Sequence, residues 1–106
     1  MLSVVDLVFQ ALADPHRREL LDRLRRDGDQ TLTQLCDRMP MSRQAVSKHL
    51  AVLGQADLVR ARRQGRTRVH TLNATPLRDV TGWLDDYARL WDERLDQLRS
   101  YLEENP

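Results

Sequence analysis

The 106-residue sequence has little cysteine, glycine or proline and no long apolar run, and each shortage excludes a class of protein. The single cysteine, Cys36, allows neither an intrachain disulfide nor a complete zinc site built from cysteines of one chain. Four glycines and four prolines argue against a β-sandwich or barrel, which needs many turns. No apolar run approaches the roughly 20 residues of a membrane helix, and residues 1–10 lack the pattern of a secretory signal. We therefore expect one cytoplasmic domain with no membrane partner.

Positive charge is concentrated in one block, although the whole chain has a net charge of only +1. Residues 43–72 contain seven basic residues against one acid, a net charge of +6, whereas residues 1–42 and 73–106 are each net negative. Arginine supplies nearly all of this charge, because Lys48 is the only lysine. Such a block indicates either a polyanion-binding surface or a solvated charged face, and charge alone does not separate the two.

Apolar spacing and capping residues predict two helices at the start of the chain. The first covers residues 2–13 and carries a broad apolar stripe. The second covers residues 15–26, where Asp14 can cap the free N–H groups and Pro15 fits the first turn.

Two further helices, separated by a tight turn, follow in the sequence. A short helix over residues 33–39 can be capped by Thr31 or Thr33, and Ser42 caps a longer helix over residues 43–56. The apolar residues of the longer helix fall at i, i+4 and i+7 and make one buried stripe. These residues are Val46, Leu50 and Leu53.

Residues 58–72 change from helical to alternating periodicity and predict a β-hairpin. Two strands over residues 58–63 and 67–72 flank Gly65, which suits the turn. The tip of this hairpin is rich in arginine: Arg62, Arg63, Arg66 and Arg68.

The last helix is predicted over residues 76–104, with apolar residues at heptad spacing. A helix of this length extends about 42 Å, which exceeds a domain of this size, so we expect its apolar face to be covered by a second chain. The first and last helices would form the interface of a homodimer, through Leu2, Val5, Phe9, Leu84, Tyr87, Trp91, Leu95 and Leu98. The aromatic residues Trp83, Tyr87 and Trp91 could alternatively line a pocket for an apolar effector.

The order of these elements predicts a mainly α-helical fold with a small β-hairpin, a winged helix-turn-helix of about five helices and a two-stranded wing, as one domain over residues 1–106. The N-terminus of the helix over residues 43–56 would enter the major groove of DNA. Arginine and glutamine can make paired hydrogen bonds to base edges, and the wing would lie along the DNA backbone. The expected DNA contacts are Ser42, Arg43, Gln44, Ser47, Lys48, Arg62, Arg63, Arg66 and Arg68.

Residues 41–53, MSRQAVSKHLAVL, resemble the recognition helix of the ArsR/SmtB family of bacterial repressors, and residues 9–18 resemble the start of that family's second helix. The resemblance implies a homodimer that binds an inverted-repeat DNA operator and represses transcription. It also places Arg43, Gln44, Ser47 and Lys48 toward the bases or phosphates.

The sequence departs from the metal-sensing members of that family. Those members carry paired cysteines on the short helix, whereas in this chain only Cys36 falls at such a place and Gln34 stands where the other cysteine would be. Its last helix has no histidine for the family's other metal site. The similarity is therefore to the metal-independent branch, with no cofactor and an unknown effector. Asp57 replaces a usual glycine after the recognition helix, and aspartate tolerates the left-handed conformation.

The sequence bears on three other interpretations. Cys36 could make the protein a redox-sensing or metal-sensing repressor, although a free cysteine between apolar positions is usually core. A helical dimer could bind an acidic protein through the basic hairpin, but such a protein has no need of Arg43 and Gln44 behind a serine cap. An enzyme is not expected, because the sequence has no glycine-rich phosphate loop and no histidine beside a visible nucleophile.

Overall fold

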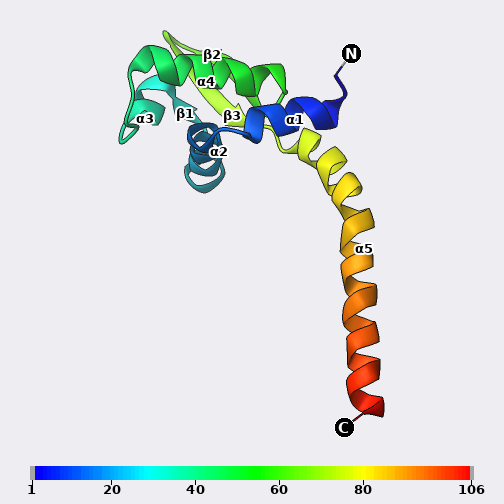
Figure 1. The fold of residues 1–106 in the computed structure, drawn as a ribbon. Helices are drawn as coiled ribbons and strands as arrows, with labels where there is room; N and C mark the ends of the chain where they lie inside the picture. The colour runs from blue at the N-terminus through cyan, green and yellow to red at the C-terminus, as the bar shows by residue number, and fades with distance from the viewer. Residues whose placement is uncertain (1, 106) are drawn as a thin grey trace.

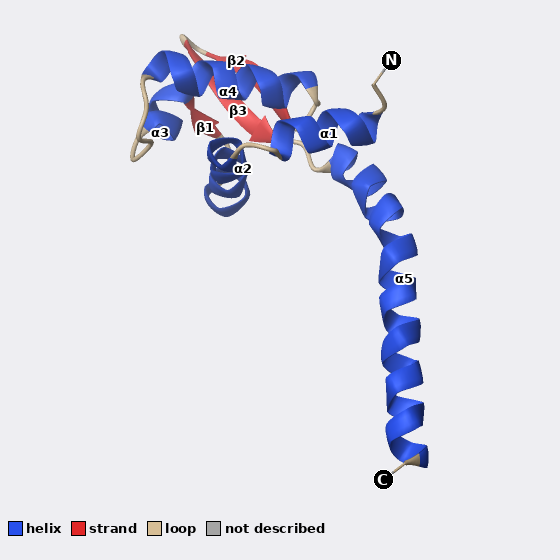
Figure 2. Ribbon diagram, viewed as in Figure 1, coloured by secondary structure: helices blue, strands red, loops and turns tan. Residues whose placement is uncertain are grey.

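The computed structural model describes residues 2–105, which form five helices and three strands. The helices are α1 (Val4–Leu12), α2 (Pro15–Asp27), α3 (Leu32–Cys36), α4 (Arg43–Gln55) and α5 (Thr75–Glu104). The strands are β1 (Gln30–Thr31), β2 (Val59–Gln64) and β3 (Thr67–Leu72). The first four helices and the sheet form one body, and α5 projects from it (Figures 1 and 2). The expected mainly helical winged helix-turn-helix fold is confirmed.

The helices begin where side chains satisfy their free N–H groups. Asp14 Oδ1 accepts hydrogen bonds from the N–H groups of His16 and Arg17 at 2.8 and 3.2 Å, and Ser42 Oγ accepts from Ala45 at 3.1 Å. Thr31 caps α3, which decides between the two threonines that the sequence offered. A cap of this kind typically contributes about 1 kcal/mol to stability.

Two helix boundaries differ from the prediction by more than one residue. Helix α1 begins at Val4 rather than at residue 2, because Ser3 caps it in a reciprocal hydrogen-bond pair with Asp6 that the sequence analysis missed. Helix α3 ends at Cys36 rather than at residue 39. The backbone of Arg38 has a positive φ of 65°, which is incompatible with a continued right-handed helix.

The wing is part of a three-stranded antiparallel sheet, so the expected two-stranded wing is incomplete. The strand order is β1-β3-β2, and Gln30 and Thr31 of β1 pair with His70 and Val69 of β3. A strand of two residues has too few positions to show alternating periodicity, so it escaped the sequence analysis. Gly65 has a φ of 64° in the turn between β2 and β3, as predicted.

The core is built around the predicted stripe of α4. Val46, Leu50 and Leu53 are all buried, and they pack with the fully buried Leu20 and Leu35. Burial of such side chains stabilises the fold by roughly 1.5–3 kcal/mol each. The chain leaves this helix through a left-handed residue that precedes β2, as expected. This residue is Asp57, with a φ of 57°.

Helix α5 packs on the body only at its beginning. Val80 is its last buried residue, and every described residue after it is exposed. The ring of Phe9 on α1 meets Trp83 edge-on at 5.5 Å between centroids, and Trp83 lies 4.8 Å from Tyr87. Although α5 is 30 residues long, no helix among residues 2–105 is apolar enough along its length to cross a membrane.

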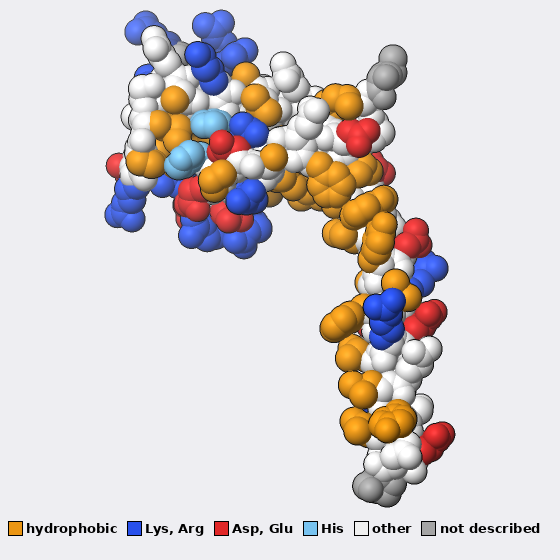
Figure 3. All heavy atoms as spheres, in the orientation of Figure 1, with side chains coloured by type: hydrophobic (Ala, Val, Ile, Leu, Met, Phe, Trp, Pro, Cys, Tyr) orange, Lys and Arg blue, Asp and Glu red, His pale blue; other side chains and the backbone are white. Residues whose placement is uncertain are grey.

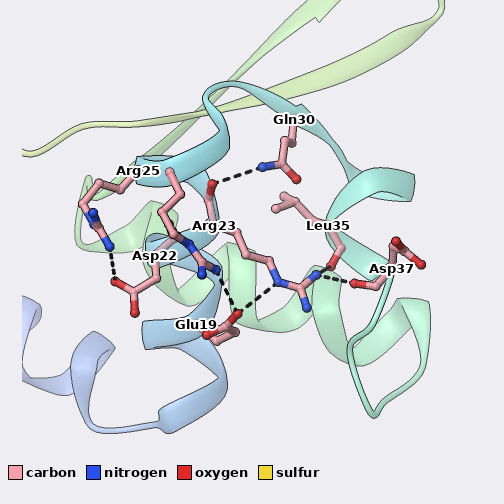
Figure 4. A network of polar contacts seen from close by, with 8 residues as sticks. Glu19, Asp22, Arg23, Arg25, Gln30, Leu35 and Asp37 are labelled. Atoms are coloured by element: carbon pink, nitrogen blue, oxygen red, sulfur yellow. Dashed lines mark hydrogen bonds and ion pairs between the residues drawn. The ribbon is translucent and has the colours of Figure 1, made fainter.

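A single arginine joins α2 to the far end of α3 (Figure 4). Arg23 Nη1 donates to the carbonyl of Leu35 at 3.2 Å and to the carbonyl of Asp37, while its Nε donates to Glu19 Oε1 at 3.2 Å. Its side chain is only 13% exposed. These bonds satisfy carbonyls that α3 leaves free at its C-terminus, and they anchor the turn that leads into α4.

We predict that Arg23→Ala destabilises the protein by about 1–3 kcal/mol, because it leaves the carbonyl of the buried Leu35 without its donor. The matched control is Arg25→Ala. Arg25 forms only an exposed ion pair with Asp22 at 3.8 Å, so its loss should change stability by less than about 0.5 kcal/mol. Urea unfolding of the three proteins at one concentration measures the difference. Equal midpoints for both variants would contradict the anchoring role.

Candidate nucleic-acid interface

The exposed face of α4 carries the side chains that the sequence predicted for base contact. Arg43, Gln44, Ser47 and Lys48 are all exposed, on the side of the helix away from its buried stripe. Arg43 Nη1 donates to Thr33 Oγ1 of α3 at 3.1 Å, so this guanidinium is held along the neighbouring helix in the free protein. The face is available to a partner without disturbing the core.

The N-terminus of α4 suits a phosphate. The Ser42 hydroxyl uses a lone pair to accept from Ala45, so its own O–H remains available to donate. The first amides of a helix have no intrahelical partners, and the helix dipole makes this end positive. Ser42 and the first turn of α4 can therefore donate together to one anionic group.

The register of the hairpin sorts its arginines onto two faces. Arg63 lies directly opposite Arg68, and Ala61 lies opposite His70, all on the face turned toward α4. Arg62 lies on the other face, where its guanidinium forms an ion pair with Asp29 at 3.0 Å. The sequence prediction grouped Arg62 with the other wing arginines, and it did not identify Asp29 as a partner.

Arg60 is also paired with an acid. Its guanidinium makes two hydrogen bonds to the Asp57 carboxylate, at 3.1 and 2.9 Å. These bonds lower the pKa of Asp57, and a hydrogen bond from Asn73 acts in the same direction. The charge of Arg60 is thus already partly compensated within the chain.

The face toward α4 carries uncompensated positive charge. A hollow of about 480 Å³ at the wing tip is lined by Arg63, Arg66 and Arg68 together with Ala61 and Thr67, and no acid lines it. Like charges directly opposite each other on neighbouring strands destabilise a sheet. An anion in this hollow would remove that repulsion, which makes the wing tip a candidate phosphate site.

The α4 face and the arginine face of the wing adjoin each other. Ser47 of α4 and Arg68 of β3 line the same hollow, together with His70. Burial lowers the pKa of His70, and the nearby Arg68 lowers it further, so the imidazole is predominantly uncharged at neutral pH. The structure thus brings the predicted helix and wing residues together and leaves Arg62 apart.

The described residues contain no cluster of three histidine, cysteine or acidic side chains able to hold a metal ion. Cys36 is half-buried and packs against the hydrophobic core.

An exposed polar helix face behind a serine cap, flanked by a basic hairpin, defines a DNA-binding protein of the winged helix-turn-helix class. Residues 12–62 match the protein family described as a helix-turn-helix domain. The chain is 34% identical to the transcriptional repressor SdpR of Bacillus subtilis, over 83% of this chain and 97% of SdpR. It is 41% identical to the HTH-type transcriptional regulator Rv2034 of Mycobacterium tuberculosis, over 85% of this chain and 80% of Rv2034.

Solved structures agree with these relatives. An ArsR family transcriptional regulator shares 34% identity and a TM-score of 0.76, covering 85% of this chain and 98% of that chain. An ArsR-like transcriptional regulator from Rhodococcus sp. RHA1 shares 33% identity and a TM-score of 0.71, covering 92% of each. The chain belongs to the ArsR family of transcriptional regulators. It is a DNA-binding regulator and not an enzyme.

We predict that Arg68→Gln weakens binding to every DNA duplex to a similar degree and lowers the slope of log affinity against log salt by about one, since one phosphate contact is lost. Arg62→Gln is the matched control and should have a smaller effect, because Asp29 already neutralises Arg62. Fluorescence anisotropy titrations over a range of salt concentrations measure both. An equal loss in the two variants would show that the hairpin faces are not divided in this way.

Proposed function

We propose that this regulator is a homodimeric repressor that occupies an inverted-repeat operator and needs no metal effector. The main support for this proposal is that a surface of α4 and a surface of the wing face in the same direction. Ser47 from the polar face of α4 and the unpaired arginines of the wing line adjoining hollows on one side of the body. A helix in the major groove and a hairpin along the backbone require this arrangement.

The apolar surface of α5 supports the dimer. Figure 3 shows hydrophobic side chains along one side of this helix and acidic side chains on another. The proposed interface residues Leu2, Phe9, Leu84, Tyr87, Trp91, Leu95 and Leu98 are all at least 41% exposed. Val5 is half-buried against its own core, so it would contribute less than the others. A continuous apolar surface of this length is unusual on a soluble monomer, and a second copy of the chain would cover it.

Repression follows from occupancy of DNA. The relative SdpR is named as a transcriptional repressor, and it aligns with most of this chain. Two α4 helices related by a two-fold axis would enter successive major grooves about 34 Å apart, which matches the half-sites of an inverted repeat. A dimer bound in this way would block other proteins from the same DNA.

Independence from metal is supported by the role of Gln34. This residue stands where metal-sensing members carry one of two cysteines. Its side chain instead accepts the N–H of Thr31 at 2.9 Å and completes the capping box of α3. The position thus serves the fold of the helix, and Cys36 alone cannot supply a complete set of metal ligands.

We predict that Gln44→Ala weakens binding to a duplex selected from genomic DNA by about 1–3 kcal/mol and relaxes the choice of base at one position of each half-site. The control is Gln55→Ala, which removes the same side chain from the opposite end of α4. Binding to the selected duplex and to single-base variants of it measures the effect. A protein whose natural target is an acidic protein would select no duplex, and its Gln44→Ala and Gln55→Ala variants would behave alike.

We predict that Trp91→Ala weakens the dimer without unfolding the chain. Trp91 is 63% exposed, so its truncation removes little packing within the chain. Loss of a large aromatic residue that the partner buries typically costs about 3–5 kcal/mol. Sedimentation velocity should detect monomers at micromolar concentration, with Arg89→Ala on the same helix as the control. A Trp91→Ala protein that stays dimeric at that concentration would exclude this residue from the interface.

A further inference from the structure

A hollow of about 330 Å³ lies between α4 and the wing. Its lining comes from α4 on one side and the sheet on the other, chiefly Leu50, Ala51, Gly54, Val59, Ala61 and His70. It shares Ala61 and Arg68 with the arginine hollow at the wing tip, so the two hollows adjoin and form one surface. We call this surface the α4–wing furrow.

The inner part of the furrow is apolar and contains small side chains. Ala51 and Ala61 are both exposed, and no large residue covers them. A methyl group added at Gly54 would meet only the carbonyl oxygen of Val59, at 3.8 Å. Apolar surface left in water is unfavourable, and a ligand that covered it would gain from its burial.

The outer part of the furrow carries charge of one sign. Arg63 and Arg68 face each other across the hairpin, and neither forms an ion pair within residues 2–105. His70 lies between the apolar part and the arginines on the same face of the hairpin and contributes no charge at neutral pH. The furrow therefore has an apolar floor and a cationic mouth.

We propose that the α4–wing furrow binds a small amphipathic anion, a monocarboxylate with a medium-length acyl chain, and that this ligand releases the protein from DNA. The carboxylate would bind Arg63 and Arg68, and the acyl chain would cover Ala51 and Ala61. The hollow between α4 and the wing has a volume of about 330 Å³ without the adjoining hollow at the wing tip, which is at the lower end of the range of small-molecule sites. The release of DNA rests on the proposed function, because the ligand and a DNA phosphate would compete for the same two arginines.

The binding step is tested on the free protein, without DNA. Octanoate is titrated into protein labelled for NMR, and acetate and octanol serve as probes of the charged head and the apolar tail alone. We expect octanoate to shift the methyl signals of Ala51 and Ala61 and the ring signals of His70 saturably, and each partial probe to bind much more weakly. Octanoate shifts confined to Leu95 and Leu98 of α5, or equal binding of octanol, would overturn the site.

Variants of the furrow make the test specific. Ala61→Leu fills the floor and should abolish the octanoate shifts while a dispersed spectrum shows that the protein is folded. Gly54→Ala adds one methyl to the same floor, at a helical position that accepts it, and should weaken octanoate in the same direction. Gln64→Leu adds the same leucine to the opposite face of β2 and should leave octanoate binding unchanged. Octanoate binding that survives in both floor variants would refute the location.

Competition with DNA is measured separately. At about ten times its own dissociation constant, octanoate should raise the apparent dissociation constant for a selected duplex about tenfold, by simple competition. An unchanged DNA affinity at saturating octanoate would refute the releasing role. If the protein bound no duplex at all, the proposed function would fail, whereas the NMR titration would still decide whether the furrow is a binding site.

Discussion

The rotation of α4 about its own axis, relative to the core, determines which of its side chains face outward. Val46, Leu50 and Leu53 are all buried, and each helical residue is turned about 100° from the one before. Burial of this stripe therefore determines which side chains face outward, and Gln44, Ser47 and Lys48 occupy the exposed side. A shift of one residue in the stripe would turn the whole polar face away from the wing. The hydrophobic core thus sets the geometry of the DNA-binding surface.

The position of α4 along the body is set by polar contacts. Helix α3 has only five residues, which is too short for a helix to be stable without contacts to the rest of the protein. Arg23 bonds the carbonyls at its C-terminal end, and the turn that follows leads directly to the Ser42 cap. A largely enclosed guanidinium needs several hydrogen-bond acceptors, and that of Arg23 donates to one carboxylate and two carbonyls. Arg23 of α2 therefore helps to position α4, although its hydrogen bonds lie outside the DNA-binding surface.

Much of this architecture could be predicted from local sequence, because caps, apolar stripes and turn residues act over a few positions. Asp14, Ser42 and Gly65 each had a local reason for its place, and the structure confirms them. The pairing of Arg63 with Arg68 could also be predicted, since the turn fixes the register of a hairpin. The ion pair between Arg62 and Asp29 was not, because it joins residues 33 positions apart. Strand β1 was missed because two residues are too few to show alternation and because its partner, β3, is distant in sequence.

Two surfaces of the free chain are energetically unfavourable in water, one because it is apolar and the other because its charges repel. The α5 stripe exposes apolar side chains, whereas the wing tip holds arginines opposite each other without acids between them. Contact with another apolar surface would remove the first from water, and a bound anion would neutralise the second.

The two surfaces also differ in local charge, because residues 73–106 carry eight acids against four arginines. Since α5 projects from the body and away from the wing tip, these acids lie far from the basic block (Figure 3). A polyanion that approaches the wing is therefore attracted by the strong positive field of the basic block. Salt screens this field within about 10 Å, so the distant acids of α5 weaken it little.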